Sequence, residues 1–276
     1  MNEELEAKYH SLTEALRRLD SLAVAFSGGV DSTLLVRAAH DLLGDKVLAV
    51  TAASETYPPA ELESARRLAD EIGVRHIVIQ TKELEIPGFR NNPPDRCYHC
   101  KRELFSHVRA VAAKHGVSHV ADGSNADDLN DYRPGARAVE ELGVLTPLSD
   151  ARLTKADIRE LSHDLGLPTW DKPAYACLAS RFPYGADITP DKLRMVERAE
   201  AFLHELGFAQ CRVRHHGDVA RIEVEPARLR DLAAPGTARR IVQALGQIGF
   251  CYVALDLEGY RTGSMNEALE LGEEPQ

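Results

Sequence analysis

The string Ser-Gly-Gly-Val-Asp-Ser, which begins at Ser27, combines the side chains that a phosphate-binding turn requires. Gly28 and Gly29 allow the backbone to approach an anion closely and to adopt conformations closed to residues with a Cβ. Ser27, Ser32 and the N–H groups at the start of a following helix can then bind phosphate, assisted by the helix dipole. Asp31 is placed to hold a Mg²⁺ ion that bridges nucleotide phosphates. The string is neither a Walker loop, which ends in Gly-Lys-Ser/Thr, nor a G-x-G-x-x-G dinucleotide turn, so it indicates another class of nucleotide site.

A second polar loop, Asp-Gly-Ser-Asn-Ala-Asp-Asp, ends at Asp128 and follows an expected short strand. Open α/β sheets bind ligands at the carboxyl ends of their strands, where this loop is expected. Ser124 and Asn125 are therefore candidates for positioning a nucleotide, and Asp127 or Asp128 for completing a magnesium site. The alternative is a polar turn that caps the next helix. Arg133 is a weaker candidate for a cation that faces the leaving pyrophosphate.

The five cysteines form the next chemically active group, and their odd number argues against a disulfide framework. Cys97 and Cys100 form a C-x-x-C, a pair that by itself suits redox activity, zinc or part of an iron–sulfur site. With Cys177, three thiolates can hold three corners of a [4Fe–4S] cluster and leave one iron open to a ligand such as sulfide. Zinc is the alternative, although the histidine inside the C-x-x-C is an awkward fourth ligand. Cys211 and Cys251 stand among apolar neighbours in expected strands and are interpreted as core residues.

The elements that must position these residues follow an alternating pattern. Strands are expected at 22–26, 47–51, 76–80 and 119–121, and helices at 33–43, 59–72, 100–114 and 155–165. Short strands alternating with helices of 10–15 residues predict βαβ units and therefore an α/β fold with a doubly wound parallel sheet.

A stretch from 168 to 190 that lacks a clean period marks the expected domain junction. We expect a nucleotide-binding domain at 1–170 and a smaller α/β domain at 171–276. The expected elements of the smaller domain are helices at 191–206 and 237–248 and strands at 211–214, 219–224 and 252–256.

The bulk composition restricts location and partners. The 276 residues carry 33 Lys and Arg against 43 Asp and Glu, a formal net charge of −10. Nucleic-acid binders take much of their affinity from neutralising phosphates, so this charge disfavours a nucleic-acid partner. The acidic start has no signal peptide, and no apolar run approaches the roughly 20 residues that span a bilayer. We expect a cytoplasmic protein without a membrane partner.

Three motifs together carry a family resemblance. The first string is similar to the PP-loop of ATP pyrophosphatases, which cleave ATP between its α and β phosphates. With it stand Cys-Leu-Ala-Ser-Arg-Phe-Pro-Tyr-Gly from Cys177 and Gly-Tyr-Arg-Thr-Gly-Ser-Met-Asn from Gly259. In these motifs the chain resembles the LarE-type sulfur transferases, which act in the synthesis of the nickel-pincer nucleotide cofactor of lactate racemase.

The resemblance implies a reaction. A carboxylate of pyridinium-3,5-biscarboxylic acid mononucleotide, a small-molecule nucleotide, attacks the α-phosphate of ATP and releases pyrophosphate. A protein-bound sulfur then displaces AMP to leave a thiocarboxylate, and a second cycle gives the bisthiocarboxylate.

Two sulfur sources occur in the resembled family. In one type Cys177 would be sacrificed, because elimination after the transfer leaves dehydroalanine. In the other type three cysteines hold a [4Fe–4S] cluster that delivers sulfide. The sacrificial type lacks the C-x-x-C, so its presence here favours the cluster, with Cys97, Cys100 and Cys177 as ligands and an external sulfide donor to recharge it.

Several polar residues carry over by matching position. Arg212 and Arg214, two apart on an expected strand, point to the same face. Together with Ser180 and Arg181 they would suit the substrate phosphate, since arginine binds phosphate in a bidentate manner. A solvated strand face is the alternative.

Three acidic residues, Glu200, Glu223 and Asp231, resemble carboxylates that approach the sulfur-bearing cysteine, where the first two can bind a divalent metal. A plain surface carboxylate is the alternative for each. The resemblance also implies a homo-oligomer.

Three other functions compete with this interpretation. A PP-loop amide-forming synthetase leaves the cysteines without a role. A PP-loop tRNA thiolase is disfavoured by the acidic charge, and a non-enzymatic nucleotide-binding module needs neither the cysteines nor Asp31.

Overall fold

The computed structural model describes residues 2–130, 134–173, 176–261 and 263–266, and in it the chain forms two compact units. The first unit comprises Met1–Glu83 and Asp95–Tyr175, and the second comprises Leu84–Pro94 and Ala176–Gln276. The segment Leu84–Pro94 groups with the second unit, although it lies far ahead of the junction expected from the sequence. The chain therefore crosses between the units three times.

The first unit is built on a four-stranded parallel sheet of order β3-β2-β1-β4. Its strands are β1 (Leu22–Ala25), β2 (Val47–Ala53), β3 (Arg75–Gln80) and β4 (His119–Ala121). From β1 the sheet grows to one side through β2 and β3 and to the other through β4. This reversal confirms the doubly wound α/β fold predicted from the sequence.

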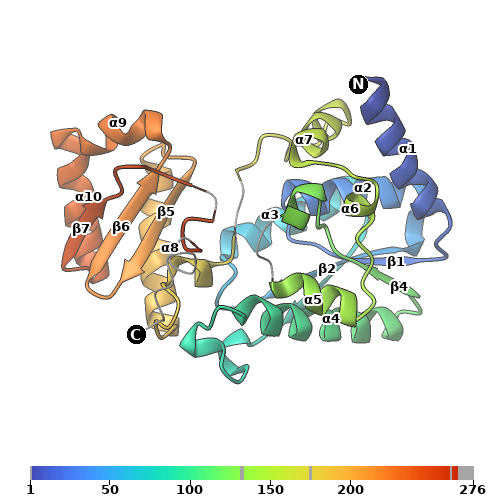
Figure 1. The fold of residues 1–276 in the computed structure, drawn as a ribbon, viewed down its shortest axis with the longest axis horizontal. Coiled ribbons are helices and arrows are strands. Elements are labelled where there is room, and N and C mark those ends of the chain that lie inside the picture. Colours follow the sequence, from blue (N-terminus) through green and yellow to red (C-terminus); the bar gives the residue numbers. More distant parts are fainter. Residues whose placement is uncertain (1, 131–133, 174–175, 262, 267–276) are drawn as a thin grey trace. The chain divides into compact units, whose positions relative to one another are not determined.

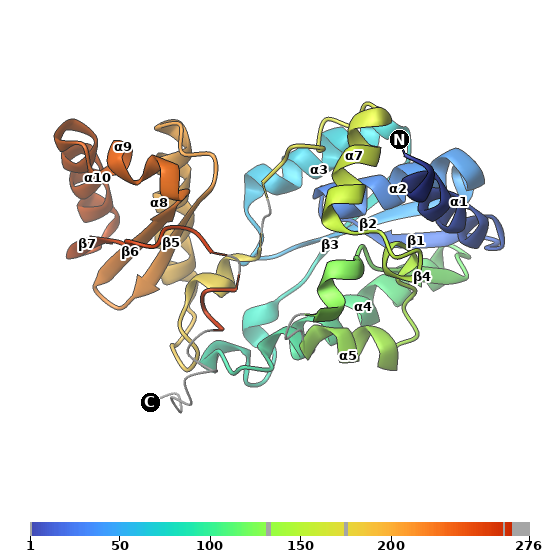
Figure 2. The ribbon, with the colours of Figure 1, turned by 45° about the horizontal axis from the view of Figure 1, so that its top comes forward.

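Helices cover both faces of this sheet, as Figures 1 and 2 show. One face carries α1 (Glu3–Arg17), α2 (Val30–Leu43), α3 (Pro59–Ile72), α6 (Pro147–Asp150) and α7 (Lys155–Asp164), and the other carries α4 (Arg96–Lys114) and α5 (Pro134–Glu141). Alternate strand residues supply the two cores, since Val24 packs with the first group and Ala23 with the second. Both faces are thus buried, which explains why the strands read as continuous apolar runs.

Two helix starts differ from the sequence expectation in ways that matter for the site. Helix α2 begins at Val30 rather than 33, which places Asp31 in its first turn. Helix α4 begins at Arg96 rather than 100, so Cys97 lies in its first turn. Because the ring of a proline disfavours the helical conformation in the residue before it, a helix rarely extends to the N-terminal side of Pro94, and α4 starts after it.

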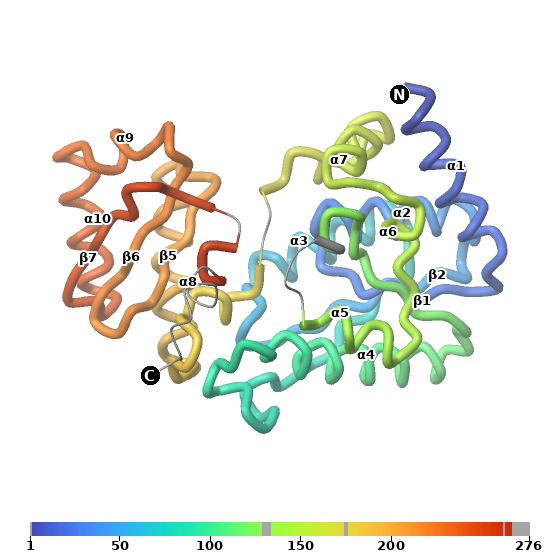
Figure 3. Tube along the Cα trace, viewed as in Figure 1, coloured from blue at the N-terminus to red at the C-terminus, as the bar shows by residue number. Residues whose placement is uncertain are grey.

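The second unit has a three-stranded sheet of β5 (Cys211–His216), β6 (Val219–Val224) and β7 (Tyr252–Leu255), whose path Figure 3 traces. Strands β5 and β6 are antiparallel, and β6 and β7 are parallel. Helices α8 (Pro190–Glu205), α9 (Leu229–Ala233) and α10 (Pro235–Ile248) share one apolar core with the sheet. The smaller α/β unit predicted from the sequence is confirmed.

Short 3₁₀ segments complete the described structure, at Gly44–Lys46, Glu83–Glu85, Phe89–Asn91, Ala126–Asn130, Leu178–Arg181 and Pro226–Arg228. Within the described residues, no helix has the length and apolar character needed to cross a membrane.

Candidate functional site

The predicted phosphate loop is the turn between β1 and α2. Gly28 has a φ of +64°, and a Cβ on it would lie 3.2 Å from Ala65 of α3. The two serines of the loop approach each other, with 3.2 Å between their Oγ atoms, and Gly29 donates its N–H to Ser27 Oγ at 3.4 Å. Both the backbone conformation and the close approach of Ala65 thus favour glycine at 28.

The second predicted loop, after β4, meets the phosphate loop at the carboxyl edge of the sheet. Asn125 donates its Nδ2–H to Asp31 Oδ1 at 3.2 Å, and a Cβ on Gly123 would lie 3.1 Å from the backbone N of Ser32. Asp127 accepts from the backbone N–H of Lys155 at 2.8 Å. The structure therefore joins Asn125 directly to Asp31, whereas the Asp127 carboxylate binds the first backbone N–H of α7. Arg133 lies outside the described residues.

Three lysines that the sequence analysis did not identify surround these loops. Lys155 Nζ forms an ion pair with Asp31 Oδ2, Lys101 Nζ bonds Asp122 Oδ2 at 2.6 Å, and Lys172 Nζ donates to the carbonyl of Gly28 at 3.0 Å. None of these three lysines is part of the phosphate-loop motif. The only sequence signal for Lys155 is its place at the start of a helix.

Asp31 offers the type of donor atom that the predicted magnesium role requires. Its carboxylate accepts bonds from two neighbours, the amide of Asn125 and the ammonium of Lys155, and is only partly exposed. Carboxylate oxygens beside nucleotide phosphates are the ligands that Mg²⁺ prefers.

The C-x-x-C thiols lie in the first turn of α4. Residues three apart on a helix share a face, so Cys97, which is exposed, and Cys100, which is half-buried, form a thiol pair. An Nη2–H of Arg96 points to Cys97 Sγ at 3.8 Å. His99 pairs with Asp95 at 3.3 Å.

The two thiols are the type of ligand that an iron–sulfur cluster requires. Cys177, the third predicted ligand, belongs to the second unit. Among the described residues no three His, Cys, Asp or Glu side chains are gathered as a metal site.

The two other cysteines differ in burial. Cys211 is buried, and burial raises the pKa of its thiol to about 12, which confirms it as a core residue. Cys251 is exposed, so its assignment to the core was wrong: it directly precedes β7, an edge strand of the second sheet.

Arg181 holds the backbone that carries Cys177. Its guanidinium is fully buried and bonds both carboxylate oxygens of Glu200 at 2.9 Å. The remaining nitrogen, Nη1, donates to the carbonyls of Ala176 at 2.7 Å and Cys177 at 3.1 Å, and to Ser180 Oγ at 2.9 Å. Burial by itself would raise the pKa of Glu200, but the charge and hydrogen bonds of Arg181 hold that pKa below its ordinary value.

Arg212 and Arg214 lie on the same face of β5, as predicted, opposite the helices. Arg214 makes two bonds to Glu223, of 2.9 and 2.7 Å, and one of 2.9 Å to the carbonyl of Ser180. Arg212 donates to the Cys211 carbonyl at 2.6 Å, and burial lowers its pKa. Both Glu200 and Glu223 are thus paired with guanidiniums in this structure.

Asp231, the third predicted carboxylate, is exposed and pairs with Arg228 at 2.7 Å. It lies on the short helix α9, which shares the apolar core with the sheet through Leu232.

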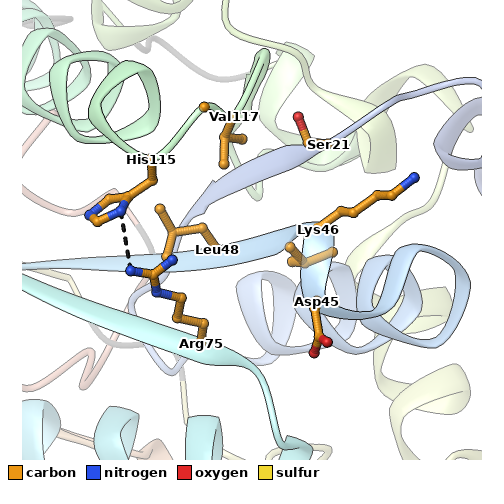
Figure 4. A pocket seen from close by; sticks show the side chains of 9 residues that line it. Ser21, Asp45, Lys46, Leu48, Arg75, His115 and Val117 are labelled. Carbon is orange, nitrogen blue, oxygen red and sulfur yellow. Dashed lines mark hydrogen bonds between the residues drawn. The ribbon is translucent and has the colours of Figure 1, made fainter.

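A pocket of about 210 Å³ lies at the opposite, amino edge of the first sheet and contains none of the predicted residues. Figure 4 shows Arg75 and His115 pointing toward each other, with 3.1 Å between Nη2 and Nδ1, while Lys46 and Asp45 point away from them. Its polar groups do not converge, and the predicted chemistry gathers at the carboxyl edge instead.

Comparison with known proteins identifies the family. Residues 6–89 match the pattern of the asparagine synthase family. Over 96% of this chain and 96% of the relative, the sequence is 42% identical to the pyridinium-3,5-bisthiocarboxylic acid mononucleotide synthase of Lactiplantibacillus plantarum. The chain belongs to this family, the LarE-type sulfur transferases. The resemblance stated from the motifs is thereby confirmed.

Two further relatives extend the comparison. An uncharacterized protein of Synechocystis is 45% identical over 96% of this chain and 99% of its own. The glutamine-hydrolyzing GMP synthase of Aeropyrum pernix is 28% identical over 67% of this chain and 40% of its own.

Proposed function

We propose that the protein is an ATP-dependent sulfur transferase that converts pyridinium-3,5-biscarboxylic acid mononucleotide to its bisthiocarboxylate. The observation that carries the proposal is the agreement, over nearly the whole chain, with a relative named for that product. The nucleotide loops at the carboxyl edge of the first sheet and the cysteine segments supply residues for the two halves of the reaction.

In the first half, a substrate carboxylate oxygen attacks the α-phosphorus of ATP, and the bond to the leaving pyrophosphate breaks. The loop formed by Ser27, Gly28, Gly29 and Ser32 presents N–H and O–H donors to the phosphates. Asp31 would hold the Mg²⁺ that accompanies ATP. Since Lys155 pairs with Asp31, its ammonium lies close enough to turn to the pyrophosphate as negative charge develops there.

The second loop completes the proposed nucleotide site. Ser124 donates to Asp122, the partner of Lys101, while Asn125 bonds Asp31 and Asp127 holds the start of α7. These bonds fix the loop against the phosphate loop, so that a bound ATP meets groups already in place.

In the second half, sulfur attacks the acyl carbon and AMP leaves with the electrons of the C–O bond. We propose that Cys97, Cys100 and Cys177 would hold a [4Fe–4S] cluster, which would supply the sulfide for this attack. Both cysteine segments stand directly after a crossing of the chain between the units, since Cys97 follows Pro94 by three residues and Cys177 follows Tyr175 by two.

For the substrate phosphate we propose Ser180, Arg212 and Arg214, which gather around β5. A cytoplasmic location, a homo-oligomer and an external sulfide donor stay predictions from the sequence.

The deciding experiment is an anaerobic purification followed by measurement of iron and acid-labile sulfide. Equal amounts, lost in Cys97→Ala, Cys100→Ala and Cys177→Ala but kept in the exposed-cysteine control Cys251→Ala, are the expected result. If both are absent even after reconstitution, the cluster is refuted. A mass loss of one H₂S at Cys177 after turnover would then identify the sacrificial route.

ATP–pyrophosphate exchange tests the substrate. We expect exchange to depend on the biscarboxylate nucleotide. Exchange that depends only on tRNA or on ammonia would contradict the proposal and favour a thiolase or an amide-forming synthetase.

A further inference from the structure

A buried ion pair in the second unit is joined directly to the main chain of Cys177. Arg181 and Glu200 are 0% and 2% exposed, and they meet through two parallel bonds of 2.9 Å. Such a pair gives little net stability, because desolvating both charges costs about as much as their attraction returns. Its presence in a small core therefore calls for another explanation.

The explanation lies in what the rest of each side chain contacts. Arg181 Nη1 bonds the carbonyls of Ala176 and Cys177, the residue before the thiol and the thiol residue itself. Glu200 Oε1 also accepts the backbone N–H of Val213 at 2.9 Å. Val213 lies between the two arginines of β5, on the edge strand of the sheet. The pair thus links the backbone of Cys177 to the strand proposed to bind the substrate phosphate.

A second pair holds the same turn from its other end. Arg214 makes its two bonds to Glu223 and donates Nη1–H to the carbonyl of Ser180. Ser180 in turn donates its hydroxyl, at 2.9 Å, and its N–H, at 3.0 Å, to the carbonyl of Cys177. The turn Cys177–Arg181 is therefore fixed at both ends by guanidiniums whose own orientation is set by a buried carboxylate.

We propose that Arg181 and Glu200 are positioning residues that orient Cys177 for sulfur transfer, and that neither contacts the substrate phosphate or a metal. The proposal rests on the proposed sulfur-transfer function. Buried bidentate pairing uses the planar fork of arginine, so lysine cannot replace it. Orientation of a reacting group to within about 1 Å is worth on the order of 10²-fold in rate.

The test compares Arg181→Lys, the double variant Arg181→Gln/Glu200→Gln, and the control Arg194→Gln. The control breaks the exposed pair of Arg194 with Asp191 in the same unit. The double variant removes both buried charges, so no unpaired charge remains to unfold the protein.

We expect Arg181→Lys and the double variant to form thiocarboxylate about 10²-fold more slowly. ATP–pyrophosphate exchange should stay within about twofold, because the nucleotide loops lie in the other unit. The melting temperature of the double variant should be close to that of the wild type. Recovery of sulfur transfer in a stable double variant would overturn the proposal, since the pair would then be merely structural.

A second readout does not depend on the reaction. In iron-free protein, iodoacetamide alkylation of Cys177 is measured by peptide mass spectrometry relative to the exposed Cys251. We expect the ratio of the two rates to change severalfold in both pair variants and to stay constant in Arg194→Gln. If the wild type shows no exchange with the biscarboxylate nucleotide, the proposed function fails, and this ratio alone decides the positioning role: an unchanged ratio refutes it.

Discussion

At the scale of single residues, the nucleotide site depends on cations that stand beside its acids. Lys155 pairs with Asp31, Lys101 with Asp122, and Lys172 with Glu61, at 2.7 Å in the last case. An apo site that already holds its carboxylates in fixed positions needs little rearrangement when ATP and Mg²⁺ arrive.

Replacing Lys155 by glutamine tests its role toward the leaving pyrophosphate. We expect a loss of about 10²-fold in the rate of ATP–pyrophosphate exchange, as for removal of one preorganised donor from a charged transition state. Lys8→Gln is the matched control. Lys8 belongs to α1 and pairs with Asp157, which lies on α7 together with Lys155. Equal rates in the two variants would contradict a role of Lys155 in the chemistry.

His76 provides a pH prediction. Burial, together with Arg66, lowers the pKa of His76, whose Nε2 lies 2.7 Å from Thr51 Oγ1 beneath the phosphate loop. Because Thr51 donates its hydroxyl to the Phe26 carbonyl at 2.6 Å, its oxygen accepts the hydrogen bond from His76 Nε2. A histidine with a lowered folded pKa stabilises the protein above its unfolded pKa of about 6.5 and loses that contribution as the pH falls.

The melting temperature of the wild type should therefore fall between pH 6.5 and 5 by more than that of His76→Gln. Only the difference between the wild type and His76→Gln is informative, since His215 and His216 also have lowered pKa values in both proteins. Parallel curves for the two proteins would refute the assignment.

At the scale of elements, the turn from β1 to α2 combines backbone strain with a close approach. Gly28 lies in the turn before α2 and Gly44 follows the last residue of α2, with φ values of +64° and +56°. Of these two glycines, only Gly28 would crowd a neighbour if it carried a Cβ. The two glycines therefore separate the cost of backbone conformation from the cost of a distorted site.

Gly28→Ala and Gly44→Ala should each lose stability by roughly 1–3 kcal/mol, the usual cost of a sparsely populated backbone conformation with positive φ. Gly28→Ala should in addition raise the KM for ATP severalfold, because the 3.2 Å contacts with Ala65 must widen. Urea unfolding and exchange kinetics measure the two effects. An unchanged KM in Gly28→Ala would show that the loop tolerates the shift.

At the scale of the whole molecule, the chain leaves the first unit and returns to it before it reaches the C-x-x-C. The segment Leu84–Pro94 is held in the second unit by Asn92, which is fully buried with a φ of 48°. Its Nδ2 donates to the carbonyls of Phe182 at 2.9 Å and Pro183 at 2.6 Å. This excursion joins the segment ahead of Cys97 to the motif that follows Cys177.

Asn92→Gly keeps the left-handed backbone but removes both side-chain bonds. We expect a loss of about 1–3 kcal/mol, since two carbonyls lose their donor in a buried site. Hydrogen exchange should increase around residues 182–188 and stay unchanged in the first sheet. Increased exchange in β1 and β2 as well would contradict a local anchor.

The sequence by itself determined the local features of this protein. Strand–helix alternation predicted the parallel sheet, and the Gly-Gly turn predicted the nucleotide loop. That turn, together with the segments from Cys177 and from Gly259, predicted the family. Each of these motifs spans only a few residues, where backbone sterics and hydrogen bonding to near neighbours decide the structure.

Tertiary structure decided which charged groups meet. Lys155 is 124 positions from Asp31, Glu200 is 19 from Arg181, and Asn92 is 90 from Phe182, and nothing in their local sequence specifies these partners. The same holds for Cys251, whose apolar neighbours predicted burial, although it is exposed directly ahead of an edge strand. Burial and pairing depend on which elements pack together, and this is a property of the whole core.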